Sequence, residues 1–188
     1  MTVQKLAIDG CYVIEHKVFP DERGLFREWF KASDLLETNS DFSVQQANYS
    51  HSKTGVLRGI HYSLAPRGQA KLITCAQGKV LDVVIDLRKG SPTYLSVEYV
   101  ELSSDSGKTV FIASGVGHGF LVQSDDASVV YLTSSAFAPE FEKNLSPLDP
   151  VLGINWALPD GVNLILSPAD KNAPTLAELE KSGLLPLY

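Results

Sequence analysis

Short apolar runs recur along the chain, and turn-forming residues separate them. The runs are rich in Val, Ile, Leu, Phe and Tyr, which favour strands, and Gly, Ser, Asp and Pro stand between them. No helical pattern comes between consecutive runs, so this rhythm predicts an all-β sandwich, barrel or jelly roll and not an alternating β/α fold. The clearest predicted strands are Lys71–Cys75, Val80–Leu87, Val97–Leu102, Val110–Ala113, Phe120–Gln123 and Val129–Thr133.

The run Val80–Leu87 is almost continuously apolar and is interrupted only by Asp82 and Asp86. A strand with one solvated face would alternate apolar and polar residues instead. We therefore expect both faces of this strand to be covered, in the middle of two packed sheets or at a subunit interface.

Helical signals are few. A short helix is expected over Lys31–Glu37, and a clearer one begins after Thr175, because Glu178 three residues later completes a capping box. Gly183 is a natural end for this second helix. No repeat or linker interrupts the chain, and 188 residues fit one domain, residues 1–188, better than two.

The composition narrows the class of partner. Hydrophobic residues make up 44% of the chain, charged residues 20%, and the formal net charge is −6. A negative protein repels polyanions, so nucleic acid is not an expected partner, whereas a small anionic ligand can bind where a few Arg and Lys converge. The first residues do not predict a signal peptide, and no apolar run approaches the ~18 residues that span a bilayer.

The two cysteines, Cys11 and Cys75, are too few for a disulfide framework. Buried, reduced thiols in a cytoplasmic protein are therefore expected. The sequence leaves open whether either thiol has a redox role.

Two of the four histidines, His61 and His118, stand in glycine-rich segments, and His118 resembles the second motif of cupin barrels. A metal-binding cupin needs an H-x-H pair and a carboxylate a few residues later. Here His61 is followed by Tyr62-Ser63, and no acidic residue occurs from Tyr62 to Val80. Two imidazoles are too few ligands for a stable site, so no metal is predicted. The remaining two, His16 and His51, are expected to be structural.

Without a metal, His61 becomes a candidate general base, because the ordinary pKa of histidine lies near working pH. Such a base needs a carboxylate partner to fix its tautomer, and Asp82, Asp86 and Asp170 are all eligible. Arg58 lies three positions before His61, so a regular strand would send the two side chains to opposite faces. A bulge at Gly59 could bring both into one pocket; otherwise only one of them lines it.

The chain also carries a series of motifs in a fixed order. They are DERGLFRE at 21–28, QANYS at 46–50, LRGIHY at 57–62, QAKL at 69–72, DVVIDLR at 82–88 with SPT at 91–93, GHGF at 117–120, YLT at 131–133 and LSPAD at 166–170 before Ala173-Pro174. In this order and spacing the chain resembles, nearly end to end, the dTDP-4-dehydrorhamnose 3,5-epimerase family, the sugar-nucleotide epimerases of deoxysugar biosynthesis.

The resemblance implies a cupin-type jelly roll that works without metal or cofactor. It implies that His61 is the base, that Asp170 supports it, that Tyr131 is the acid on the opposite face of the sugar, and that Lys71 lies near the keto oxygen. It further implies a homodimer that exchanges its early strands, with Arg23, Phe26 and Glu28 serving the neighbour's pocket. We expect the interface to include Arg23–Phe30, because Leu25, Phe26, Trp29 and Phe30 cluster there. The residues matching the nucleotide and pyrophosphate site are Arg23, Phe26, Glu28, Gln46, Asn48, Arg58 and His118.

The implied reaction is epimerisation of a dTDP-4-keto-6-deoxyhexose at C3 and C5. One departure bears on it: the chain reads Ser135-Ala136-Phe137 where many 3,5-epimerases have two tyrosines. A mono-epimerase at C3 or C5 in an antibiotic deoxysugar pathway is therefore an alternative, and residues 136 and 137 are a plausible site of the difference. Two further alternatives are a non-catalytic sugar-nucleotide-binding cupin and a metal-dependent cupin oxygenase.

Overall fold

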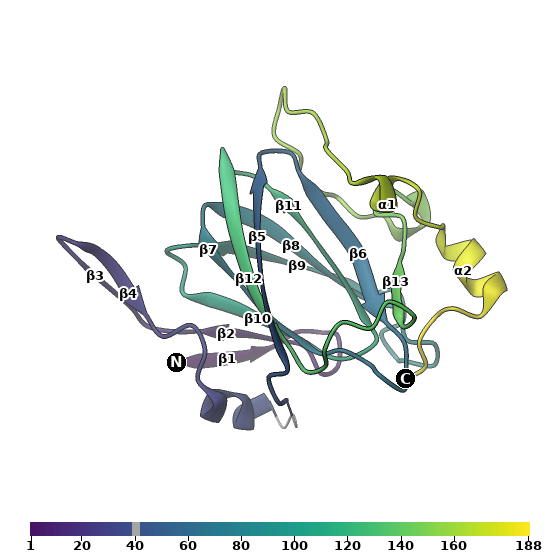
Figure 1. Cartoon of the computed structure of the whole chain (residues 1–188), viewed down its shortest axis with the longest axis horizontal. Coiled ribbons are helices and arrows are strands. Elements are labelled where there is room, and N and C mark those ends of the chain that lie inside the picture. Colours follow the sequence, from purple (N-terminus) through teal and green to yellow (C-terminus); the bar gives the residue numbers. More distant parts are fainter. Residues whose placement is uncertain (39–41) are drawn as a thin grey trace.

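Two antiparallel sheets lie face to face in the computed structural model, which describes residues 1–38 and 42–188 (Figure 1). The six-stranded sheet has the order β1 (Thr2–Lys5), β2 (Tyr12–Glu15), β10 (Lys108–Ile112), β7 (Lys71–Gln77), β12 (Asp126–Thr133) and β5 (Gln46–Lys53). The five-stranded sheet has the order β13 (Glu142–Asn144), β6 (Leu57–Ser63), β11 (Val116–Val122), β8 (Lys79–Asp86) and β9 (Val97–Ser103). The all-β prediction is confirmed.

The remaining elements lie outside these two sheets. A separate hairpin of β3 (Val18–Asp21) and β4 (Gly24–Arg27) projects away from both of them (Figure 1). The helical elements are the 3₁₀ helices η1 (Ala32–Thr38) and η2 (Pro150–Leu152) and the α-helices α1 (Pro168–Lys171) and α2 (Leu176–Ser182). No helix in the described ranges is long and apolar enough to cross a membrane.

All six predicted strands are present, and the largest difference is in β11. This strand begins at Val116, whereas the glycine-rich sequence predicted a turn there and a strand only from Phe120. Gly117 and His118 pair with Ile85 and Val84 of β8, so the segment is already part of the sheet. The predicted short helix over 31–37 is the 3₁₀ helix η1.

Strand β8 is covered on both faces. Val80 and Val84 face the core between the two sheets, whereas Val83 and Ile85 face a second core. That second core lies under the C-terminal segment, which contains α1 and α2 (Figure 1). The strand therefore runs through the middle of the molecule, the first of the two expected arrangements, and its two aspartates are fully buried.

Helix α2 covers the second core and has the expected ends. Thr175 and Glu178 form both hydrogen bonds of the capping box, and Gly183 ends the helix with a φ of +67°. Leu176 and Leu179 are buried against the five-stranded sheet. The two cysteines are free and buried in the core between the sheets, and burial raises the pKa of Cys11 to about 12 and that of Cys75 to about 11.

Asp86 closes the loop after β8. Its carboxylate accepts hydrogen bonds from Arg88 Nε and Nη2 at 2.8 and 2.9 Å and from the hydroxyls of Ser91 and Thr93 at 2.6 and 2.7 Å. Burial by itself would raise the pKa of Asp86, but these bonds outweigh it and lower the pKa to about 2. The carboxylate therefore stabilises the fold only while it is ionised.

We expect Asp86→Asn to lower the free energy of unfolding by about 3 kcal/mol, because Arg88 would stay buried without its counter-ion. Urea denaturation measures this, and Glu101→Gln, which removes an exposed ion pair to Lys79, is the matched control with an expected loss of about 0.5 kcal/mol. The wild-type contribution, roughly 2 kcal/mol, is present above the unfolded pKa of 3.8 and is lost as the pH falls towards 2. Equal losses for the two variants would contradict this role.

Candidate active site

Two adjoining cavities open between the sheets and share His61, Lys71 and Tyr131. The larger has a volume of about 430 Å³, and the smaller about 130 Å³. The larger is also lined by Gln46, Asn48, Gln69, Phe137, Glu142 and Asn144, and the smaller by Ser50, Arg58, His118 and Phe120. Of the eleven residues predicted for the site, seven thus line these cavities: His61, Lys71, Tyr131, Gln46, Asn48, Arg58 and His118.

A bulge in β6 explains how Arg58 and His61 reach one cavity. Against β11, His61 pairs with His118 and Arg58 pairs with Phe120, so β6 spans one residue more than its partner. The extra residue reverses the alternation between Arg58 and His61, and both side chains line the smaller cavity. Gly59 sits in the bulge with a φ of +122°, a conformation that other residues rarely adopt.

His61 is held by Asp170, which reaches it from α1. The distance between His61 Nε2 and Asp170 Oδ1 is 2.7 Å, and Asp170 Oδ2 accepts a second hydrogen bond from Ser167 Oγ at 2.7 Å. Burial alone would raise the pKa of Asp170, but the hydrogen bonds from His61 and Ser167 lower it below its ordinary value. An ionised Asp170 keeps the proton on Nε2 and leaves Nδ1 as the basic nitrogen.

Each of the three eligible aspartates has a different partner. Asp170 bonds to His61, Asp86 bonds to Arg88, and Asp82 Oδ2 lies 2.7 Å from His118 Nε2. The smaller cavity is therefore lined by two histidines that each contact a buried carboxylate. In the described ranges, no group of three or more His, Cys, Asp or Glu side chains is placed to hold a metal ion.

Tyr131 and Lys71 line the cavity from the opposite sheet. Tyr131 is on β12 and Lys71 on the neighbouring β7, where Lys71 pairs with Thr133 and Ile73 pairs with Tyr131. Burial raises the pKa of the Tyr131 phenol and lowers that of the Lys71 ammonium. The cavity thus has a histidine on one wall and a phenol and an amine on the other.

Strand β5 supplies the polar floor. Gln46, Asn48 and Ser50 alternate along it toward the cavities, and Gln46 Nε2 donates to Asn48 Oδ1 at 2.7 Å. Arg58 Nε donates to Ser52 Oγ at 3.0 Å, which fixes the guanidinium beside this strand. The sequence analysis missed Ser50, although its alternation with Gln46 and Asn48 was a signal that could have found it.

Glu142 was also missed, and the sequence offered no signal for it. It lies on the three-residue strand β13, which only its pairing with β6 brings to the site. Asp170, in contrast, was predicted, but it lies behind His61 and does not line these cavities.

Three predicted residues line neither of the two cavities of the candidate site. Arg23 lies at the tip of the β3–β4 hairpin, bonded to Asp21, and Phe26 is 65% exposed on the same hairpin. Glu28 lines a separate, small cavity with His16 and Lys31. The structure of one chain therefore gives these three no place in the site.

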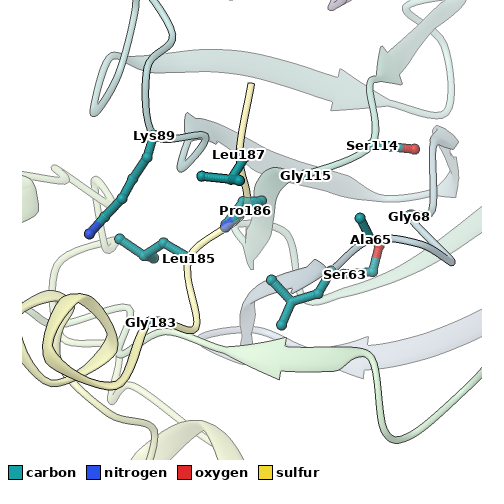
Figure 2. Close-up of a pocket in the computed structure, with 11 residues that line it drawn as sticks. Ser63, Ala65, Gly68, Lys89, Ser114, Gly115, Gly183, Leu185, Pro186 and Leu187 are labelled. Carbon is teal, nitrogen blue, oxygen red and sulfur yellow. The ribbon is translucent and has the colours of Figure 1, made fainter.

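A cavity of about 480 Å³ lies elsewhere, between the end of β6 and the C-terminal tail (Figure 2). Leu185, Pro186 and Leu187 of the tail form one wall, and the only ionisable side chain at its lining is Lys89. It has no pair of groups that could exchange a proton with a ligand, so it is not the candidate active site.

We expect Gly59→Ala to disturb the site more than its φ alone explains. A Cβ at Gly59 would lie 2.5 Å from the Gly119 Cα and 2.7 Å from the His118 carbonyl oxygen. Gly24 is the matched control, because its φ of +124° is nearly the same while a Cβ there meets nothing within 4 Å. The midpoint of thermal unfolding should fall further in Gly59→Ala than in Gly24→Ala, where only the backbone strain acts; equal decreases would remove the clash from the explanation.

Comparisons with known proteins identify this arrangement. The family model described as dTDP-4-dehydrorhamnose 3,5-epimerase matches residues 5–178. The dTDP-4-dehydrorhamnose 3,5-epimerase of Streptomyces griseus is 46% identical over 99% of this chain and 92% of its own length. An epimerase structure from Mycobacterium tuberculosis has a TM-score of 0.95 at 38% identity, covering 100% of this chain and 94% of its own.

A 3'-monoepimerase from Streptomyces bikiniensis, solved in complex with dTDP-quinovose, has a TM-score of 0.91 at 45% identity and covers 98% of this chain and 93% of its own. These likenesses confirm the predicted cupin-type fold and extend over almost the whole chain. The chain therefore belongs to the dTDP-4-dehydrorhamnose 3,5-epimerase family and is a carbohydrate epimerase.

Proposed function

We propose that this enzyme epimerises a dTDP-4-keto-6-deoxyhexose at C3 and C5, taking a proton from one face of the sugar and returning one to the other. The observation that carries the proposal is the division of the cavity: His61, hydrogen-bonded to Asp170 of α1, is on the five-stranded sheet, and Tyr131 is on the facing sheet. A planar enolate between them would meet a base on one face and an acid on the other.

His61 removes the proton from the carbon next to the ketone. The bond to Asp170 leaves Nδ1 unprotonated, and the nearby carboxylate stabilises the imidazolium that forms. Asp170 is a positioning residue in this step, because it acts through His61 and does not line the cavity.

Lys71 and Tyr131 complete the reaction. As a cation beside the keto oxygen, Lys71 stabilises the negative charge that develops there when the proton leaves. Tyr131 then delivers its phenolic proton to the opposite face, and its raised pKa means that it holds this proton at neutral pH. The result is inversion without any change in oxidation state.

Hydrogen-bond donors beside this chemistry suit a diphosphate. Arg58 and His118 line the smaller cavity next to His61, while the formal net charge of the chain is −6. A guanidinium binds phosphate oxygens with several parallel donors, and Arg58 uses only its Nε for Ser52. We place the pyrophosphate at the smaller cavity and the hexose in the larger one, with Gln46 and Asn48 beside it.

Epimerisation at a single carbon is the second candidate. Phe137 lines the larger cavity, is 62% exposed, and its backbone N–H donates to Gln46 Oε1 at 2.9 Å. The resemblance described above implies a tyrosine phenol near this wall in many 3,5-epimerases, and Phe137 offers no such polar group to orient the sugar for its second proton transfer. The relative from S. bikiniensis, a 3'-monoepimerase, is nearly as similar in sequence as the 3,5-epimerase from S. griseus, so identity does not separate the two candidates.

We also propose that the enzyme is a homodimer joined through the β3–β4 hairpin. Phe19, Leu25 and Phe26 are 47%, 46% and 65% exposed on this projecting hairpin, and an isolated two-stranded hairpin is marginally stable in water. Trp29 and Phe30, which are also expected at the interface, are half-buried against the outer face of the six-stranded sheet. Exchange of the hairpins would bring Arg23, Phe26 and Glu28 to the partner's site.

A cytoplasmic location belongs to the same proposal. Both thiols are buried and unpaired, as is usual for proteins of a reducing compartment. Fractionation of the native host followed by an assay for epimerase activity tests it.

His61→Ala should lower kcat with dTDP-4-keto-6-deoxyglucose at least ~10²-fold, because a positioned general base is lost. The dissociation constant of dTDP should change little, since the nucleotide is held by other groups. His51→Ala is the matched control: His51 is exposed on β5, contacts only Ser128 through its ring, and should leave kcat unchanged. Activity of His61→Ala within a few-fold of wild type would remove His61 from the mechanism.

In heavy water, each carbon that passes through the enolate should gain one deuterium, because Tyr131 exchanges its proton with solvent. We expect label at both C3 and C5 of the product, measured by NMR and mass spectrometry. Label at one carbon only would establish the mono-epimerase candidate. Bound nucleotide sugar with no label at either carbon would contradict epimerisation of this substrate.

Light scattering at micromolar concentration should give the mass of a dimer. Phe26→Asp should shift the protein to monomer and lower its activity, because an apolar contact and the partner's Arg23 are lost together. Val151→Asp is the matched control, because Val151 is an apolar side chain that is 70% exposed on η2, outside the hairpin. A wild-type monomer with full activity would refute the dimer.

A further inference from the structure

Glu142 is the one carboxylate in the lining of the larger cavity, and the reaction scheme above gives it no role. Strand β13 pairs with β6 so that Asn144 lies opposite His61 and Glu142 opposite Ser63. Because side chains alternate along a strand, Glu142 and Asn144 share the face that carries His61, and both line the cavity. Lys143, between them, bonds to the backbone carbonyls of residues 140 and 142 instead.

The ammonium of Lys71 is buried, and a nearby carboxylate would stabilise its charge. Its side chain is buried, and within the described residues no carboxylate lies within 4.0 Å of its ammonium and no protein group accepts a hydrogen bond from it. Burial disfavours the charged form of a lysine and so lowers the pKa of Lys71, while Glu142 and then Asp82 act in the opposite direction.

Of the two carboxylates that act on Lys71, Glu142 is the stronger. Asp82 of β8 is bonded to His118 through Oδ2, its Oδ1 is buried without a hydrogen-bond partner among the described residues, and it raises the pKa of Lys71 less than Glu142 does. Glu142 makes no side-chain hydrogen bond within the described part of the chain, and burial raises its pKa while Lys71 and His61 lower it. The other titratable or charged groups facing the cavities around Lys71 are His61 and Arg58 of β6, His118 of β11 and Tyr131 of β12.

We propose that Glu142 is the counter-ion that keeps Lys71 in its ammonium form, so that Lys71 can stabilise the enolate oxygen; this rests on the proposed function. Glu142 acts on the reaction only through Lys71, because its negative charge favours the ammonium form of that lysine. The gap between the two groups matters, since a direct ion pair would occupy the ammonium, whereas a more distant carboxylate leaves its N–H groups free for the keto oxygen.

The first test needs no turnover. In protein labelled with ¹³C at the lysine Cε, the Lys71 signal is assigned by its absence from Lys71→Arg and then titrated with pH. Glu142→Gln should lower the pKa of Lys71 by about one unit, because an opposite charge at this range shifts a pKa by that order. Glu140→Gln removes an exposed carboxylate two residues away and should leave it unchanged. Glu142→Ala is a second variant, in case Glu142→Gln does not fold. The pKa of Lys71 should fall in each of the two variants that folds.

The second test is kinetic. In Glu142→Gln the basic limb of the kcat profile should move to lower pH by the same amount, with KM within about 2-fold of wild type, and Glu142→Asp should restore the wild-type position. In a Lys71→Gln background, Glu142→Gln should change nothing further. An unchanged Lys71 titration would overturn the inference. Absence of turnover in the wild type would instead refute the proposed function, while the titration would still decide the role of Glu142.

Discussion

The extra residue that β6 carries opposite β11 is the constraint on which the site depends. Without the bulge at Gly59, strand alternation would place Arg58 and His61 on opposite faces of the five-stranded sheet. One of them would then lie in the core under the C-terminal segment, where a buried charge has no partner. With the bulge, the group proposed to bind the pyrophosphate and the group proposed to move the proton share one cavity, and α1 is left to supply Asp170 from behind.

Among the described residues, three pairs of ionisable groups each contain a buried carboxylate. His61 with Asp170, His118 with Asp82 and Arg88 with Asp86 are each joined at 2.7–2.8 Å. In each pair the carboxylate is almost fully buried, so the charge or tautomer of its partner is held in place by the fold. Lys71 differs from His61, His118 and Arg88 because no carboxylate of the described residues lies within 4.0 Å of its ammonium, and this separation leaves the amine available to a ligand.

Much of the fold could be predicted from the sequence because the relevant signals are local. Strands followed from apolar runs between turn formers, and the caps of α2 followed from Thr175, Glu178 and Gly183. The two-sided burial of β8 followed from its nearly continuous apolar pattern. The start of β11 could not be predicted, because glycine indicates a turn unless the neighbouring strands are known. The packing of Trp29 and Phe30 on the outer face of the six-stranded sheet was not predictable either, because aromatic clustering does not say which surface covers the side chains.

The site was predictable where a residue belongs to a motif and unpredictable where only tertiary pairing places it. Spacing alone left three aspartates eligible for His61; the resemblance to the family selected Asp170, and the approach of α1 to β6 places it at His61. Glu142 reaches the cavity through a three-residue strand that carries no pattern of its own.

The central claim is that one hexose ring lies between a base on one sheet and an acid on the other. The structure of the protein with a dTDP-hexose bound tests this most directly. The account predicts the sugar in the larger cavity, with His61 Nδ1 and the Tyr131 hydroxyl within about 3.5 Å of opposite faces of the ring and the Lys71 ammonium at the oxygen on C4. A ring that meets His61 and Tyr131 on the same face, or that lies outside the cavity they share, would contradict it.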